Sequence, residues 1–61
     1  MEEKINKTIE LLKQPNGTFI STIQRIVEVG YIEAINIINK IGETHFIVFE
    51  DSKYKIIDSK E

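Results

Sequence analysis

The chain has 61 residues, a formal net charge of −2, one histidine and no cysteine. Its length corresponds to a single domain near the lower size limit at which apolar burial offsets the conformational entropy of folding. Without cysteine there are no disulfides and no thiolate ligands, and a lone histidine does not complete an ordinary zinc site. We therefore expect residues 1–61 to form one domain that holds no metal and no other cofactor.

The start of the chain lacks the features of an export signal. Met1 is followed by two glutamates and a lysine rather than by basic residues and an apolar run. No segment approaches the roughly 20 consecutive apolar residues that a membrane-spanning helix requires. We expect a cytoplasmic protein that has no membrane partner.

Residues 2–14 show the apolar periodicity of an amphipathic helix. One face of this helix carries the apolar side chains of Ile5, Ile9 and Leu12, with Leu11 at its flank. The helix is expected to stop at the turn-forming sequence Pro15-Asn16-Gly17. Residues 18–20 are then expected to form a short extended segment that pairs with a later strand.

Two short helices joined by a turn are predicted next. Ser21 is suited to an N-cap position and Gln24, three residues later, completes a capping box, so the second helix is expected to begin near Ser21. Gly30 is suited to the left-handed conformation that commonly follows a helix end. The second helix is expected to bury Ile23, Ile26 and Val27.

The third helix follows Gly30 and divides into an inward and an outward face. At about 100° per residue, one face gathers four apolar side chains that we assign to the core: Ala34, Ile37, Ile38 and Ile41. The opposite face presents Ile32, Asn36 and Asn39. The flanks between the two faces carry Glu33, Ile35 and Lys40.

Residues 45–49 and 54–57 are rich in β-branched and aromatic side chains and predict a hairpin. Asp51 and Ser52 are expected to form the turn between its strands. The face expected to pack on the core carries Ile47, Phe49, Tyr54 and Ile56. The other face carries Phe46, Val48, Lys55 and Ile57. Residues 58–61 have no pattern and are expected to be a frayed tail.

Together these elements predict an α+β fold, a winged helix-turn-helix in which three helices are followed by a β-hairpin wing. The sequence contains no nucleophile with an obvious partner base. His45 is expected to be structural or solvent-exposed, and Glu50 and Asp51 to form a solvated hairpin tip rather than a metal site. We expect no enzymatic activity and no small-molecule ligand.

The second and third helices resemble those of a known DNA-binding family. The shared pattern consists of Ile20-Ser21, Ile23-Gln24-Arg25, Val29-Gly30-Tyr31, Ala34 and Ile37-Ile38. It is similar to the winged-helix γ domain at the C-terminus of the bacterial DNA translocases FtsK and SpoIIIE. The match extends without a gap from about residue 18 to residue 41, and it covers about half of the chain.

The resemblance implies DNA recognition by the third helix. In that family the γ domain places this helix in the major groove, recognises a short oriented sequence and steers the motor along the chromosome. The present sequence has no motor and is expected to act as a free-standing relative. Glu33 and Asn36 stand where the family has basic residues, so the family's sequence preference does not transfer. Arg25 matches its motif position, which implies a backbone or groove contact.

The chemistry of the outward face is compatible with an A·T-rich duplex. Asparagine bonds adenine in bidentate fashion, and an apolar side chain such as Ile32 contacts the thymine methyl group. Arg25 and Lys40 are expected to hold phosphates, while Lys53 and Lys55 contact the backbone or the minor groove from the wing. The candidate DNA-binding residues are Gln24, Arg25, Tyr31, Ile32, Glu33, Asn36, Asn39, Lys40, Lys53 and Lys55.

Two functions remain open from the sequence. The first is a sequence-specific binder of double-stranded DNA, encoded by a plasmid, phage or other mobile element and acting in transcription regulation, segregation or DNA transfer. The second is an interaction module, such as an inhibitor, that binds a protein through its altered third helix. In that case the asparagines are ordinary solvated residues and the hairpin lysines protect a strand edge.

The charge and the isoleucines of the third helix bear on this choice. A net charge of −2 favours the protein-binding alternative, because phosphate contacts by Lys and Arg supply most non-specific DNA affinity. Exposure of Ile32 and Ile35 would create an association surface and favour a homodimer.

Overall fold

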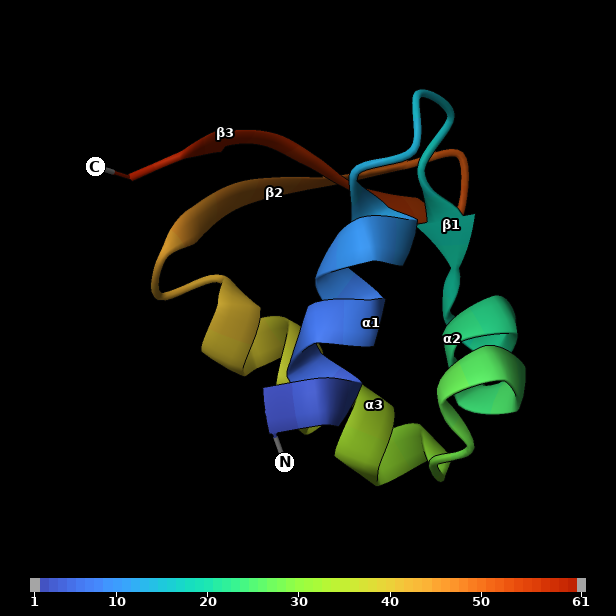
Figure 1. Ribbon diagram of the computed structural model, residues 1–61. Helices are drawn as coiled ribbons and strands as arrows, with labels where there is room; N and C mark the ends of the chain where they lie inside the picture. The colour runs from blue at the N-terminus through green and yellow to red at the C-terminus, as the bar shows by residue number, and fades with distance from the viewer. Residues whose placement is uncertain (1, 61) are drawn as a thin grey trace.

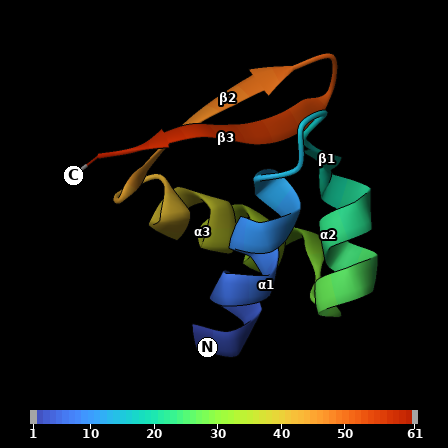
Figure 2. The ribbon, with the colours of Figure 1, turned by 45° about the horizontal axis from the view of Figure 1, so that its top comes forward.

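Three helices and a three-stranded antiparallel sheet make up the computed structural model, which describes residues 2–60. In chain order the elements are α1 (Glu2–Leu12), β1 (Thr18–Phe19), α2 (Ile20–Val27), α3 (Tyr31–Ile41), β2 (His45–Glu50) and β3 (Lys53–Ser59). The strands lie in the order β1-β3-β2. The three helices lie together on one side of the sheet (Figure 1, Figure 2). The expected α+β class is confirmed.

The core lies between the inward sides of the helices and the inner face of the sheet. Its buried apolar side chains are Leu12, Ile23, Val27, Ala34, Ile37, Ile38, Ile41 and Ile56. The four residues assigned to the inner face of the third helix are all among them, so that assignment is confirmed. The fully buried Thr8 donates its hydroxyl hydrogen to the backbone oxygen of Lys4 at 2.8 Å, which satisfies this polar group within α1.

The loop after α1 depends on Gly17. This residue has a φ of 73°, and a Cβ atom placed on it would lie 2.6 Å from the backbone oxygen of Tyr54 in β3. The loop therefore approaches β3 so closely that only glycine fits. The next residues form β1, which pairs antiparallel with β3 as expected for this segment; the partners are Thr18 with Tyr54 and Phe19 with Lys53.

The start of α2 differs from the prediction. α2 begins at Ile20 with Phe19 as its N-cap, and no side chain hydrogen-bonds at this cap, so the predicted capping box of Ser21 and Gln24 is wrong. The reason lies in the sheet. Pairing of Phe19 with Lys53 fixes the point at which the chain leaves β1, and the helix begins at the very next residue.

The predicted inner face of α2 is correct for two of its three residues. Ile23 and Val27, four residues apart, are buried, whereas Ile26 is 45% exposed. Each residue adds about 100° of rotation around a helix, so Ile26 is turned away from the stripe that Ile23 and Val27 share. Ile26 is therefore a surface residue.

The left-handed residue between α2 and α3 is Glu28 rather than Gly30. Glu28 has a φ of 63° and caps α2, whereas Gly30 has an extended backbone, with φ −77° and ψ 174°, and is the N-cap of α3. α2 ends at Val27, so the reversal falls on the residue directly after it. The predicted conformation of Gly30 is wrong because the helix ends two residues earlier than a glycine cap would require.

Replacing Glu28 by glycine is expected to stabilise the protein. A residue with a Cβ atom pays about 1 to 2 kcal/mol in the left-handed conformation, and Glu28→Gly removes this strain at the cost of extra entropy in the unfolded chain. We expect a net gain of about 0.5 to 1 kcal/mol in the free energy of unfolding, measured by urea denaturation with circular dichroism. Glu43→Gly is the matched control, since Glu43 is exposed and has no positive φ. Equal stabilisation by both changes would contradict the explanation.

β2 and β3 form the predicted hairpin. Asp51 and Ser52 have φ values of 53° and 65°, as the two central residues of a type I′ turn require. Glu50 pairs with Lys53 across this turn. The predicted position of the turn is therefore confirmed.

The inner face of the hairpin is the expected one, with one exception. The register pairs Ile47 with Ile56 and Phe49 with Tyr54, so these four side chains share a face. Ile56 is buried, and Ile47 and Tyr54 pack against the core, but Phe49 is 62% exposed. Phe49 is one residue from the end of β2, where its ring packs on Tyr54 with centroids 4.7 Å apart instead of on the core. Its assignment to the core is wrong.

The segment after Ile57 is not a frayed tail. β3 continues to Ser59, and the register shifts at a bulge so that His45 and Phe46 pair with Ser59 and Asp58. The backbone N–H of Lys60 donates to the oxygen of Thr44 at 2.9 Å. Strand pairing orders these polar residues although they have no apolar pattern of their own; Glu61 lies outside the described residues.

Candidate functional site

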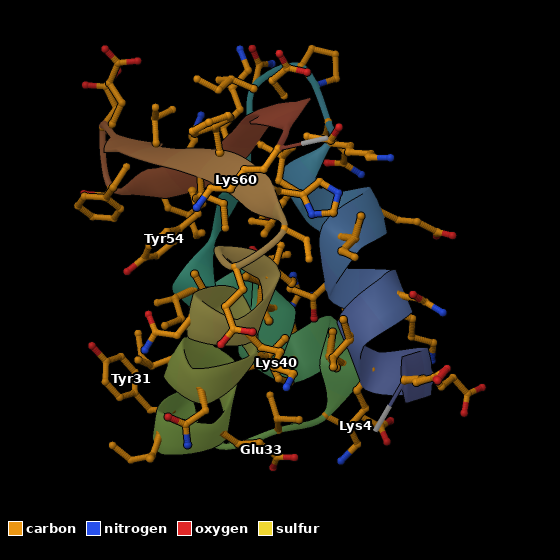
Figure 3. The ribbon with its side chains drawn as sticks, turned by 90° about the vertical axis from the view of Figure 1, so that its left-hand side faces the viewer. Lys4, Tyr31, Glu33, Lys40, Tyr54 and Lys60 are labelled. Carbon is orange, nitrogen blue, oxygen red and sulfur yellow. The ribbon has the colours of Figure 1, made fainter. Side chains whose placement is uncertain are left out.

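The outward face of α3 is exposed as predicted. Ile32 is 70% exposed, and Tyr31, Asn36, Asn39 and Lys40 are also exposed. The four core residues on the opposite side of the helix fix this orientation. Tyr31 projects from the side of α3 that faces away from α1 (Figure 3). The helix therefore presents an aromatic ring, an isoleucine, two amides and one ammonium group to solvent.

Glu33 is directed towards α1. Its Oε2 atom lies 3.5 Å from Nζ of Lys4, and both side chains are half exposed. Figure 3 shows the two residues side by side at the N-terminal ends of α1 and α3. An ion pair this exposed contributes little to stability, but it draws the carboxylate to the edge of the outward face and offsets its charge.

The remaining predicted residue of the third helix, Ile35, is half-buried. It lies on the flank of the helix, as the helical geometry predicts. A smaller fraction of its side chain is exposed than of that of Ile32. The exposed isoleucine pair expected from the sequence is therefore reduced to Ile32 in α3. The second exposed isoleucine nearby in sequence is Ile26, which comes from α2.

Arg25 and Gln24 occupy different environments in α2. Arg25 is exposed and lies midway between the two buried residues Ile23 and Val27, so it points away from the core. Gln24 is half-buried, and its backbone oxygen accepts a hydrogen bond from Val29 N at 3.1 Å in the turn between α2 and α3. Arg25 is therefore directed to solvent, whereas the backbone of Gln24 contributes to the turn.

Lys53 and Lys55 lie on the outer face of the sheet, which is directed away from the helices. They alternate along β3 with Tyr54 and Ile56, which face the core. The Nζ atom of Lys53 lies 5.2 Å from the centroid of the Phe19 ring. The structure therefore separates these two lysines from the outward face of α3 instead of adding them to it.

Acidic side chains accompany the basic ones on every element of the candidate surface. Arg25 and Lys40 of α2 and α3 are matched by Glu28 and Glu33. The hairpin carries Lys53 and Lys55 together with the acidic residues Glu50, Asp51 and Asp58. The fold thus does not concentrate the lysines and the arginine into one strongly basic surface.

The structure contains two contacts between a lysine and a phenylalanine ring that the site predicted from the sequence did not include. Besides Lys53 over Phe19, the Nζ atom of Lys60 lies 5.3 Å from the centroid of the Phe46 ring. Alternation along residues 45–49 already places Phe46 on the outer face, which is the available sequence signal. Lys60 lies in the segment expected to be frayed, and the outward direction of Phe19 depends on its pairing with β3.

Comparison of the chain with protein-family models, with curated proteins and with solved structures gave no match. Among residues 2–60, no helix is both long enough and apolar enough to cross a membrane. The same part of the chain contains no group of three or more His, Asp or Glu side chains that could hold a metal ion.

Proposed function

We propose that this chain is a small DNA-binding protein with a winged-helix architecture that places α3 in the major groove of a duplex. The observation that carries the proposal is the exposed outward face of α3, with Asn36 and Asn39 facing solvent. The order of the elements and the strand order β1-β3-β2 are compatible with a winged-helix-like arrangement, which supports the proposal. The resemblance of residues 18–41 to the γ domain of FtsK and SpoIIIE belongs to the same proposal and rests on the sequence pattern alone.

The residues of α2 and α3 have complementary roles in this proposal. Asn36 and Asn39 hydrogen-bond adenine, and Ile32 contacts a thymine methyl group, so the favoured site is A·T-rich. Arg25 and Lys40 contact phosphates on either side of the groove and orient the helix. Tyr31 is the first residue of α3, and the N-terminal residues of a recognition helix commonly contact the DNA bases.

We further propose a biological setting in the cytoplasm, where the protein serves a mobile element. A short recognition helix that binds one site on a duplex suits a regulator of transcription or an accessory factor of segregation or DNA transfer. Two copies on a palindromic site would double the small contact set of one chain.

A salt titration with a matched pair of variants tests the DNA-binding proposal. At about 50 mM salt the protein is expected to bind a fluorescent A·T-rich duplex, with an affinity that falls steeply as salt rises because phosphate contacts release counterions. Arg25→Ala is expected to weaken binding about fivefold to tenfold and to reduce the salt slope by about one. Lys7→Ala removes the same charge from an exposed position on α1 and is expected to change little.

Two results of this titration would contradict the proposal. No binding at low salt would remove DNA as the partner. Equal weakening by Arg25→Ala and Lys7→Ala would show that net charge, rather than a defined surface, controls the interaction. Thermal melting of both variants checks that neither change unfolds the protein.

A second candidate function is favoured by the apolar side chains around the turn from α2 to α3. Ile26, Tyr31 and Ile32 are all exposed, and contiguous patches of exposed apolar side chains commonly mark association surfaces. In this alternative α3 binds a protein, or a second copy of the chain, instead of DNA. Sedimentation analysis alongside the titration separates the two, because a homodimer without DNA affinity would support only the alternative.

A further inference from the structure

The outer face of the sheet is an unpartnered surface that combines aromatic and basic side chains. The strand register places on it Phe19 of β1, Lys53 and Lys55 of β3, and Phe46, Val48 and Glu50 of β2. Within residues 2–60, all three helices lie on the opposite side of the sheet (Figure 2). Phe46 is 50% exposed, and Phe19 and Val48 are exposed as well.

Each of the two phenylalanine rings on this face has a lysine over it. Nζ of Lys53 lies 5.2 Å from the Phe19 centroid, and Nζ of Lys60 lies 5.3 Å from the Phe46 centroid. Lys55 stands between them in the register, opposite Val48. Three ammonium groups therefore share this face with the carboxylates of Glu50 and Asp58 and of Asp51 at the hairpin turn, so the face is less acidic than the chain as a whole, whose formal net charge is −2.

A hollow opens on the same face beside the loop that joins α1 to β1. It is lined by Pro15, Asn16, Val48, Glu50, Asp51, Lys53 and Lys55. The loop projects past the sheet on the side away from the helices (Figure 1), and Pro15 and Asn16 of this loop line the hollow. The remaining lining residues belong to the hairpin, so the hollow adjoins both Val48 and the two lysines.

We propose that this outer face binds single-stranded DNA. Bases stack on the rings of Phe19 and Phe46, and the ammonium groups of Lys53, Lys55 and Lys60 contact the phosphates between them. Stacking of a base on an aromatic side chain is more favourable than an exposed cation–π contact. A base therefore displaces the lysine from the ring, and the lysine moves to the adjacent phosphate.

A second copy of the chain is a poorer occupant of this face. A standard protein interface buries about 800 Å² on each partner, whereas three short strands offer a face of only about 20 Å by 14 Å. Lys55 stands in the middle of that face and would lose its hydration against an apolar partner. A nucleic-acid strand needs less area and supplies the negative charge that Lys55 requires.

Thymine-containing DNA suits the face better than RNA. Val48 lies beside Lys55 and offers an apolar contact for the methyl group that thymine has and uracil lacks. Single-stranded RNA also stacks on aromatic side chains, and a protein distinguishes it from DNA through hydrogen bonds to the 2′-hydroxyl group. The residues that the register places on this face offer aromatic rings, apolar groups and flexible charged side chains instead.

The test uses a fluorescent oligothymidine of about 12 nucleotides and two phenylalanine variants of β2. Phe46→Ala is expected to weaken binding at least about fivefold, the loss of one stacked base. Phe49→Ala is the matched control, because Phe49 is exposed on the same strand but faces the other side of the sheet. Phe49→Ala is expected to leave the oligothymidine affinity unchanged. Both variants are first checked for native circular dichroism.

Four outcomes would overturn the proposal. These are no binding of oligothymidine at low salt, equal losses in the two variants, tighter binding of oligouridine than of oligothymidine, or self-association that Phe46→Ala abolishes in a protein without affinity for oligothymidine. The proposal does not depend on duplex binding by α3. Asn36→Ala, measured on duplex and on oligothymidine, distinguishes the two surfaces because it is expected to weaken only the former.

Discussion

Leu12→Ala is expected to lower the free energy of unfolding by about 2 to 5 kcal/mol, the usual cost of removing a buried leucine side chain. Leu12 is fully buried, is the last residue of α1 and is one of the largest buried side chains of the core. A domain of this size has a total stability of only about 3 to 9 kcal/mol. The change is therefore expected to remove a large fraction of the total stability and to lower the urea concentration at the unfolding midpoint markedly.

The neighbouring leucine provides the control for this experiment. Leu11 is half-buried at the margin of the core, so Leu11→Ala makes the same chemical change with less lost burial. Urea denaturation followed by circular dichroism is expected to show a loss for Leu11→Ala less than half of that for Leu12→Ala. Equal losses would contradict the placement of Leu12 at the centre of the core.

Gly17→Ser is expected to be the most disruptive change outside the core. The left-handed backbone alone costs a serine about 1 to 2 kcal/mol. In addition, its Cβ atom would lie 2.6 Å from the backbone oxygen of Tyr54, so the loop has to move away from β3. We expect a loss of at least about 2 kcal/mol in the free energy of unfolding and weaker protection of the β1 amides in hydrogen exchange.

The same substitution at Gly30 is the control for the loop variant. Gly30 has a negative φ, and a Cβ atom there meets no atom within 4 Å. A serine at this N-cap position would also accept a hydrogen bond from an N–H group in the first turn of α3. Gly30→Ser is therefore expected to leave stability unchanged or raised. A comparable loss at both glycines would show that the contact with Tyr54 does not determine the effect.

The two candidate surfaces lie on different sides of the fold. The outward face of α3 carries the amides and apolar groups proposed to contact a duplex, with Arg25 on the preceding helix. The outer face of the sheet carries the lysine–phenylalanine pairs proposed to bind a single strand. Because the hairpin lysines lie on the second surface, variants on the two sides are expected to have separable effects on duplex and single-strand binding.

Local patterns in the sequence were sufficient for the elements with strong periodicity. Spacings of three and four place the inner residues of α1 and α3, and every residue assigned to the inner face of α3 is buried. The same geometry places Asn36 and Asn39 in solvent. The Asp51-Ser52 turn follows from the polar break between two β-rich segments. These features depend only on neighbours within one turn of helix or one hairpin.

Tertiary contacts decided the rest. The start of α2 follows from the pairing of Phe19 with β3, and the same pairing directs that ring to the outer face of the sheet. Lys60 is ordered by Thr44 across the hairpin, although its own segment has no pattern. Sequence periodicity determined which side of each long element is apolar. Contacts between distant segments determined where the short elements begin and which exposed side chains contact one another. Both features depend on partners far away in the sequence, which local periodicity does not identify.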